Sequence, residues 1–167
     1  MTVTALLLII FPALMIWCAA SDFLTMKITN RLVLLVLASY VVVAPIAGIP
    51  FGTMLWSFGI AFAVLVVTFT LFQLGVIGGG DAKMCPAIML WVGPTLGLEF
   101  AIMFSLLGGV LTIVLLLVRR APPMPIIGGQ DWYVRLTHPK SGIPYGIAFA
   151  AGALLVYPET AIFKGLV

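Results

Sequence analysis

Two aspartates lie where long apolar runs of the chain end or begin. Asp22 follows the first run, in SDFLTMKITN, and Asp81 precedes a later run, in GVIGGGDAKM. Two carboxylates that lie close together share a proton, because both cannot ionise cheaply at short range. The ionised one can then take a proton from water while the protonated one polarises a carbonyl. If the fold brings Asp22 and Asp81 together, we expect the chemistry of aspartyl proteolysis.

Three glycines, Gly78, Gly79 and Gly80, stand directly before Asp81. Glycine permits backbone conformations and close approaches that other residues forbid. A turn needs only one or two glycines, so three in a row predict that an extended substrate or another helix packs here. A phosphate-binding loop is a competing interpretation, but such loops carry a lysine and a hydroxyl where this chain has an aspartate. We assign the three glycines and Lys83 to an active-site loop.

The composition excludes a water-soluble fold. Of the 167 residues, 63% are hydrophobic and 8% are charged, whereas soluble domains carry about 25% charged residues. Because this number of charges is too small to cover a folded surface, most of that surface must face lipid. No basic tract indicates nucleic acid binding. Cys18 and Cys85 lack the spacing of a zinc site, so we expect buried thiols, no metal and no other cofactor.

The apolar runs predict an all-α integral membrane protein with six transmembrane helices in one domain, residues 1–167. A helix that crosses a bilayer needs about 20 apolar residues, and charges, glycines and prolines mark where the runs end. The predicted spans are Val3–Ser21, Leu32–Ala47, Thr53–Leu74, Ala82–Gly93, Leu98–Val118 and Ile143–Tyr157.

The basic residues predict the orientation of these spans. Seven of the eight fall in the first, third and fifth connections, and only Lys164 falls on the other side. By the positive-inside rule those connections are cytoplasmic and both termini lie outside. The same parity puts both aspartates at the cytoplasmic boundary. In an alternative interpretation they only fix helix depth beside lysines, Asp22 with Lys27 and Asp81 with Lys83.

One long connection, at about residues 119–142, is expected to be a cytoplasmic loop. It holds five charges and four of the 11 prolines. Loops of this length usually carry a function or are disordered. The aromatic pair Trp132 and Tyr133 could form a platform for a substrate beside the active face. His138 is expected to be solvated rather than catalytic.

Three motifs, in this order, resemble the type IV prepilin peptidase family. They are Asp22 followed by Lys27-Ile28-Thr29-Asn30, the GxGD pattern Gly78-Gly79-Gly80-Asp81 with Ala82-Lys83, and Gly142-Ile143-Pro144-Tyr145-Gly146. A GxGD pattern alone is a weak signal, but the ordered set is specific, and its three motifs are spread over most of the chain. The resemblance is closest to the short CpaA/TadV-like branch, which serves Flp pili and tight adherence.

The resemblance implies a six-span GxGD intramembrane aspartyl endopeptidase of the bacterial inner membrane. Such an enzyme cuts the basic leader of a prepilin or pseudopilin after a glycine, at the cytoplasmic face. Its catalytic aspartates would be Asp22 and Asp81. The possible substrate contacts are Lys27, Asn30, Trp132, Tyr133, Pro144 and Tyr145. The oligomeric state is not indicated.

Two departures from the family pattern bear on this expectation. Thr29 stands where the family usually has proline, which loosens one turn and leaves the carboxylate untouched. Longer members also insert a cysteine-containing zinc segment and methylate the new pilin terminus. This chain has no cysteine cluster, so we do not expect methyl transfer.

Two other function classes remain open for the paired carboxylates. A proton- or cation-coupled transport subunit could relay ions through them, although transporters usually place such groups near the midplane of the bilayer. A structural subunit of a pilus or secretion assembly would tolerate neutral replacements of both.

The helix ends suggest how the two aspartates divide the chemistry. Asp81 is expected at the start of a helix, near Lys83, where the ionised form is favoured, and Asp22 at the end of one. We therefore expect Asp81 to be the base toward water and Asp22 the acid toward the scissile carbonyl.

Overall fold

The computed structural model describes residues 3–120, 129–139 and 141–167, and this part of the chain is helical without strands. The elements are α1 (Val3–Thr25), α2 (Asn30–Ile46), α3 (Phe51–Gln73), α4 (Gly79–Val92), α5 (Gly97–Arg120), α6 (Asp131–Thr137), α7 (Tyr145–Val156), the 3-10 turn η1 (Tyr157–Glu159) and α8 (Ala161–Leu166). The all-α prediction is confirmed. Six of the helices follow the six predicted runs, with ends that differ by a few residues.

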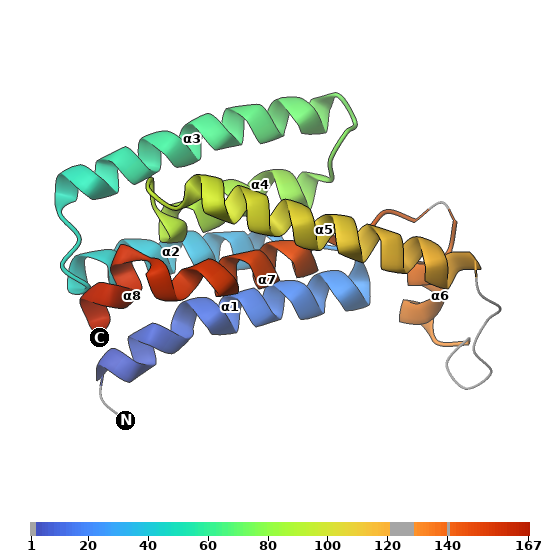
Figure 1. Cartoon of the computed structure of the whole chain (residues 1–167), viewed down its shortest axis with the longest axis horizontal. Helices are drawn as coiled ribbons and strands as arrows, with labels where there is room; N and C mark the ends of the chain where they lie inside the picture. The colour runs from blue at the N-terminus through green and yellow to red at the C-terminus, as the bar shows by residue number, and fades with distance from the viewer. Residues whose placement is uncertain (1–2, 121–128, 140) are drawn as a thin grey trace.

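The helices form an elongated bundle in which consecutive long helices run in opposite directions (Figure 1). Both ends of the chain lie at one end of the bundle, and the α1–α2 and α3–α4 connections lie at the other. The predicted loop at about 119–142 lies at this second end. Its first residues, Arg119 and Arg120, continue α5, and it contains the short helix α6. Residues 121–128 and 140 are outside the described part of the chain.

Of the six helices that follow the predicted runs, the two shortest, α4 and α7, occupy the centre of the bundle. α4 packs against α2, α3, α5 and α7, and α7 packs against α1, α4 and α5. Ten of the 14 residues of α4 are buried. A helix that is apolar on all sides is typical of such a position. The longer helices α1, α3 and α5 surround this centre and expose many large apolar side chains.

Three helices, α1, α3 and α5, are long and apolar enough to cross a membrane, and α2 is a shorter apolar helix. This pattern fits a membrane protein. α4 and α7 have 14 and 12 residues. At 1.5 Å per residue these lengths give about 21 and 18 Å, against a hydrocarbon core of about 30 Å. Helix length therefore supports three spans and a shorter fourth helix, and the count of six stays a prediction.

The indole of Trp91 ties three helices together at the centre of the bundle. Its ring stacks on Phe11 of α1, with 4.7 Å between ring centroids. Its N–H donates to the carbonyl of Val36 in α2, with 3.0 Å between Nε1 and the oxygen. The side chain of Trp91 is only 1% exposed. Its N–H needs such an acceptor, because an unpaired N–H in an apolar interior is costly.

A hydrogen bond between α3 and α4 repairs a gap that a proline leaves in α4. Pro86 has no N–H, so the carbonyl of Ala82 lacks its usual helical donor. The hydroxyl of Thr68 lies 2.8 Å from that carbonyl oxygen and can supply the donor. Backbone groups in an apolar environment must be satisfied inside the protein. The contact fixes α4 against α3 one residue after Asp81.

We predict that Trp91→Ala lowers the free energy of unfolding by about 3–5 kcal/mol, because a large core side chain leaves a cavity. Trp91→Phe keeps most of the packing and should cost about 1 kcal/mol for the lost hydrogen bond. Reversible denaturation of the purified protein in micelles measures both changes. Trp56, which is 65% exposed on α3, provides the control. Equal losses for Trp91→Ala and Trp56→Ala would contradict the assignment of the core.

Candidate active site

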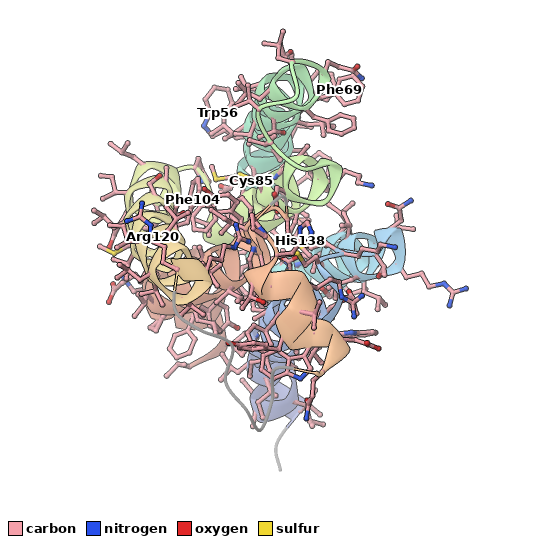
Figure 2. All side chains as sticks on the ribbon, turned by 90° about the vertical axis from the view of Figure 1, so that its right-hand side faces the viewer. Trp56, Phe69, Cys85, Phe104, Arg120 and His138 are labelled. Carbon is pink, nitrogen blue, oxygen red and sulfur yellow. The ribbon has the colours of Figure 1, made fainter. Side chains whose placement is uncertain are left out.

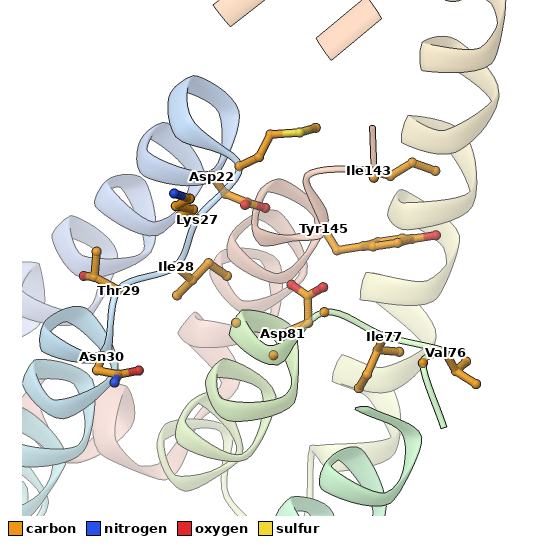
Figure 3. A pocket seen from close by; sticks show the side chains of 16 residues that line it. Asp22, Lys27, Ile28, Thr29, Asn30, Val76, Ile77, Asp81, Ile143 and Tyr145 are labelled. Atoms are coloured by element: carbon orange, nitrogen blue, oxygen red, sulfur yellow. The ribbon is translucent and has the colours of Figure 1, made fainter. Parts of the chain in front are cut away.

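A cavity of about 740 Å³ opens at the end of the bundle that carries the α1–α2 and α3–α4 connections (Figure 3). Three segments line it: residues 22 and 26–30, residues 75–81, and residues 142, 143 and 145. These are the segments of the three sequence motifs. The fold therefore brings together motifs that are more than 40 residues apart in the chain, and the cavity is the candidate site.

Asp22 is held by the first turn of α7. It lies in the last turn of α1, is 6% exposed, and its Oδ2 accepts a hydrogen bond of 2.6 Å from the backbone N–H of Gly146. The first N–H groups of a helix have no partner within the helix, and they carry partial positive charge. The start of α7 thus supplies a donor to a buried carboxylate that would otherwise lack one.

Gly146 is the residue that permits this contact. A Cβ on Gly146 would lie 2.8 Å from both Cβ and Oδ2 of Asp22, which is closer than real Cβ atoms approach. Any side chain at this position would therefore displace the carboxylate. Gly146 was not among the residues predicted for the site. The sequence did offer a signal for it, because Gly146 is the last residue of the motif Gly142-Ile143-Pro144-Tyr145-Gly146.

Asp81 lies in the first turn of α4, three residues after the N-cap Gly78. The glycines before it allow close packing. A Cβ on Gly80 would lie 3.1 Å from Cβ of Ile28, and one on Gly79 would lie 3.1 Å from the ring of Phe72. None of the three glycines has a positive φ. Glycine is thus used here for close approach, which sets the start of α4 against the α1–α2 connection.

The two carboxylates face the same cavity from different helices. Figure 3 shows both side chains directed into it, with Ile28 and Tyr145 beside them. Asp81 lies within electrostatic reach of Asp22. The fold therefore brings the two aspartates that the sequence singled out to one cavity, as the predicted pairing requires.

The expected lysine partners of the aspartates are not ion-paired with them. In the part of the chain that the structure describes, the one salt bridge joins Lys164 to Glu159, far from the cavity in sequence. Lys83 donates instead to the side-chain oxygen of Asn30, 2.6 Å away, and so links the first turns of α4 and α2. The interpretation of the aspartates as depth anchors beside lysines has no support in these contacts.

The predicted substrate contacts divide into two groups. Lys27, Asn30 and Tyr145 line the cavity, whereas Pro144, Trp132 and Tyr133 do not. Of the predicted active-site loop, the three glycines line the cavity and Lys83 does not. The other lining residues were not among the predicted site residues, and all of them except Thr29 are apolar or glycine, so the patterns of charge and polarity gave little signal for them. They are Met26, Ile28, Thr29, Gly75, Val76, Ile77, Gly142 and Ile143.

The aromatic pair lies beside the site rather than in it. The indole of Trp132 packs against Phe23, the residue after Asp22, with 5.3 Å between ring centroids. Its N–H donates to the side-chain oxygen of Gln130 at 2.6 Å. Tyr133 is 7% exposed. α6 thus packs against the end of α1, and a direct role of the pair in substrate contact stays a prediction.

Thr29, which stands where the resemblance led us to expect proline, caps the N-terminus of α2. Its hydroxyl accepts the N–H of Leu32 at 3.3 Å and caps α2. Threonine is a good N-cap, whereas proline presets only the backbone. Just before it, Met26 has a φ of 54°, which few residues other than glycine adopt. Together they turn the chain sharply between α1 and α2 at the rim of the cavity.

Arg119, at the end of α5, forms hydrogen bonds to α6 and to the segment before α7. Its Nε donates to the carbonyl of Leu136 at 2.9 Å, and a terminal nitrogen donates to the carbonyl of Gly142 at 2.7 Å. The planar guanidinium can hold two acceptors in a fixed relation. Because Gly142 lines the cavity and Gly146 holds Asp22, Arg119 helps to position the third motif.

The positions of the two aspartates at helix ends do not show which carboxylate favours the ionised form. Asp81 lies at the start of α4, as expected. Asp22 lies near the end of α1, but its carboxylate also receives the N–H of Gly146 at the start of α7. Both carboxylates therefore lie at a helix N-terminus, where partial positive charge favours the ionised form. Helix position alone therefore does not select Asp81 over Asp22 as the base.

We predict that Gly146→Ala lowers the free energy of unfolding by about 1–3 kcal/mol, the usual cost of forcing extra volume into a packed site. The new methyl group would have to displace Asp22 from its donor. Gly142→Ala is the matched control, because a Cβ there meets nothing within 4 Å. Denaturation in micelles compares the two. A Gly146→Ala protein as stable as Gly142→Ala would contradict the close contact.

Comparison with known families places both aspartates inside one match. The model of the type IV leader peptidase family matches residues 9–117, which is more than half of the chain. The matched range includes Asp22 and Asp81 and ends before Gly146. A search of curated proteins and a search of solved structures found no match to this chain. On the family match, the chain belongs to the type IV leader peptidase family.

Proposed function

We propose that this protein is a prepilin leader peptidase that works as an intramembrane aspartyl endopeptidase, with Asp22 and Asp81 as its catalytic residues. Its substrate would be a Flp-type prepilin or pseudopilin, cut after the glycine that ends a basic leader. The observation that carries the proposal is the shared cavity: two carboxylates from α1 and α4 face it, and the family match contains both.

In the proposed reaction one carboxylate is ionised and the other is protonated. The ionised carboxylate takes a proton from water, and the water oxygen forms a bond to the scissile carbonyl carbon. The protonated carboxylate gives its proton to the carbonyl oxygen. When the C–N bond breaks, the carboxyl that took the water proton gives it to the leaving nitrogen, and the other carboxylate takes a proton back from a hydroxyl of the diol, so the pair returns to its starting state. The cycle needs no metal and no cofactor.

We assign the base to Asp81 and the acid to Asp22 on the basis of access. Oδ2 of Asp22 already accepts the N–H of Gly146, so one oxygen of this buried side chain is fixed and the other is left to hold a proton toward the substrate. Asp81 is less buried and borders both the main cavity and an adjoining groove. Water and the substrate chain can therefore both reach it.

We predict that Asp22→Asn and Asp81→Asn each reduce leader cleavage by about 10³-fold or more, because an amide can neither take nor give the proton. Both proteins should still insert and accumulate. Co-expression with a candidate prepilin, followed by a gel shift for leader removal and by rates with purified prepilin, measures the effect.

Asp131→Asn is the matched control for this pair. Asp131 is an exposed aspartate in the first turn of α6, at the same end of the bundle. Its variant should cleave within about twofold of the unmodified protein. Substantial cleavage by either Asp22→Asn or Asp81→Asn would remove the aspartyl mechanism. A transport or structural role for the paired carboxylates would then account better for the cavity.

The proposal includes six spans in the bacterial inner membrane, with the cavity at the cytoplasmic face and both termini outside. The support is the placement of charge. Lys27, Arg31, Lys83, Arg119, Arg120 and Arg135 lie at the end of the bundle that holds the cavity. Glu99 and the pair Glu159 and Lys164 lie at the other end. An excess of lysine and arginine is typical of cytoplasmic loops.

We predict that a periplasmic phosphatase fused at Gly129 is inactive and that the same enzyme fused at Pro50 is active. Gly129 precedes α6 at the end with the cavity, and Pro50 joins α2 to α3 at the opposite end. Phosphatase activity per fusion molecule in intact cells is the measurement. Activity at Gly129 with none at Pro50 would reverse the orientation, and activity at both would overturn the span count.

A further inference from the structure

A second cavity adjoins the site and runs between α3 and α5. Its volume is about 480 Å³. It is lined by residues of α3, the α3–α4 connection, α4, α5 and α7, and those that matter here are Asp81, Cys85, Gly108, Gly109 and Tyr145. In Figure 2, which looks onto the end of the bundle with the cavity, Cys85 and Phe104 lie between α3 and α5. We call this cavity the lateral groove.

The groove exists because its two walls pack on different partners. α3 packs mainly against α4, and α5 packs mainly against α7. The space between α3 and α5 is therefore left open. Both walls are among the helices long and apolar enough to cross a membrane, and they expose large apolar side chains, such as Phe69 and Leu106. The groove thus opens toward lipid.

The groove is continuous with the catalytic cavity. Val76, Ile77, Asp81 and Tyr145 line both. Asp81 is the charged residue at this junction. The catalytic cavity adds polar groups such as Lys27 and Asn30, whereas the lining of the groove is mainly apolar. A single chain that passes Asp81 would therefore meet a polar environment on one side and an apolar one on the other.

Two adjacent glycines of α5 shape the wall of the groove in different ways. A Cβ on Gly108 would lie 3.2 Å from the ring of Tyr145, so Gly108 makes room for that ring. A Cβ on Gly109 would meet nothing within 4 Å, so Gly109 leaves free volume. Small residues on a membrane helix let another chain approach its backbone closely. Gly109 thus presents open backbone to whatever enters the groove.

We propose that the lateral groove binds the apolar segment of the membrane-embedded substrate that directly adjoins the scissile bond. The segment enters from the bilayer between α3 and α5, and the bond to be cut then lies at Asp81. This inference rests on the proposed function and adds the place and chemistry of substrate binding. Its occupant is a peptide segment, and lipid acyl chains are the competing occupant.

The kinetic test fills the groove from Gly109. Gly109→Trp should lower kcat/KM for a full-length prepilin in liposomes at least tenfold, mainly by raising KM, because a bulky side chain would occupy the binding volume. Val110→Trp is the matched control, since Val110 is the next residue of α5, is 59% exposed and does not line the groove. Its kcat/KM should stay within twofold of the unmodified protein.

A cross-linking test reports on binding without catalysis. The protein carries Cys18→Ala, Cys85→Ala and Asp22→Asn, so that it has no native thiol and leaves the prepilin uncut. A cysteine placed at Gly109 should form a disulfide with a cysteine scanned through the apolar segment of the prepilin, at one or two positions near the scissile bond. A cysteine placed at Val110 should form none at those positions.

The outcomes separate this inference from the proposed function. If the unmodified protein cleaves prepilin, Gly109→Trp cleaves it equally well and no cross-link forms at Gly109, lipid fills the groove and the inference is wrong. Equal losses for Gly109→Trp and Val110→Trp, or equal cross-links at both positions, also overturn it. Failure of the unmodified protein to cleave any prepilin counts against the proposed function, and the cross-link still decides the groove.

Discussion

The site depends on one buried hydrogen bond, from the N–H of Gly146 to Oδ2 of Asp22. A carboxylate that is 6% exposed requires a donor, because removing it from water without compensation is costly. The start of α7 supplies that donor, and only a glycine lets the helix come close enough. The same contact fixes α7 against α1 at the mouth of the cavity. Arg119 supports it by holding the carbonyl of Gly142, just before α7.

The position of the second carboxylate depends on how α4 is held. Gly80 lets the α1–α2 connection pack against the first turn of α4, and Lys83 links that turn to Asn30 of α2. In the same turn, the hydroxyl of Thr68 satisfies the carbonyl of Ala82, which Pro86 leaves without a donor. In an apolar environment helices associate through close packing, and polar groups must find partners within the protein. Each of these contacts provides one or the other. Asp81 thus lies on a helix that is fixed from two sides.

One carboxylate of the cavity comes from a short buried helix, α4, and the other from the end of a longer helix, α1. α4 and α7 bring their first turns to the cavity, where unpaired N–H groups and partial positive charge stabilise carboxylates. α1, α3 and α5 present apolar surfaces outward. Because α3 and α5 pack on different neighbours, the ring around the site has an opening beside Asp81. Asp81 therefore borders both the cavity with polar groups and the mainly apolar groove.

The sequence by itself determined the six apolar helices, their order and the end of the bundle at which Asp22, Asp81 and most of the positive charges lie, but not the short helices α6 and α8. These features follow from run length, hydropathy and the alternation of connections, which are local or additive properties. Only the tertiary structure decided that Gly146 holds Asp22, that Lys83 pairs with Asn30 rather than with a carboxylate, and that Trp132 lies beside the cavity. It also decided that a groove opens between α3 and α5. Such contacts join residues that are distant in the chain. They depend on the rotation of each helix about its axis and on the distance between helices, and the length of an apolar run specifies neither.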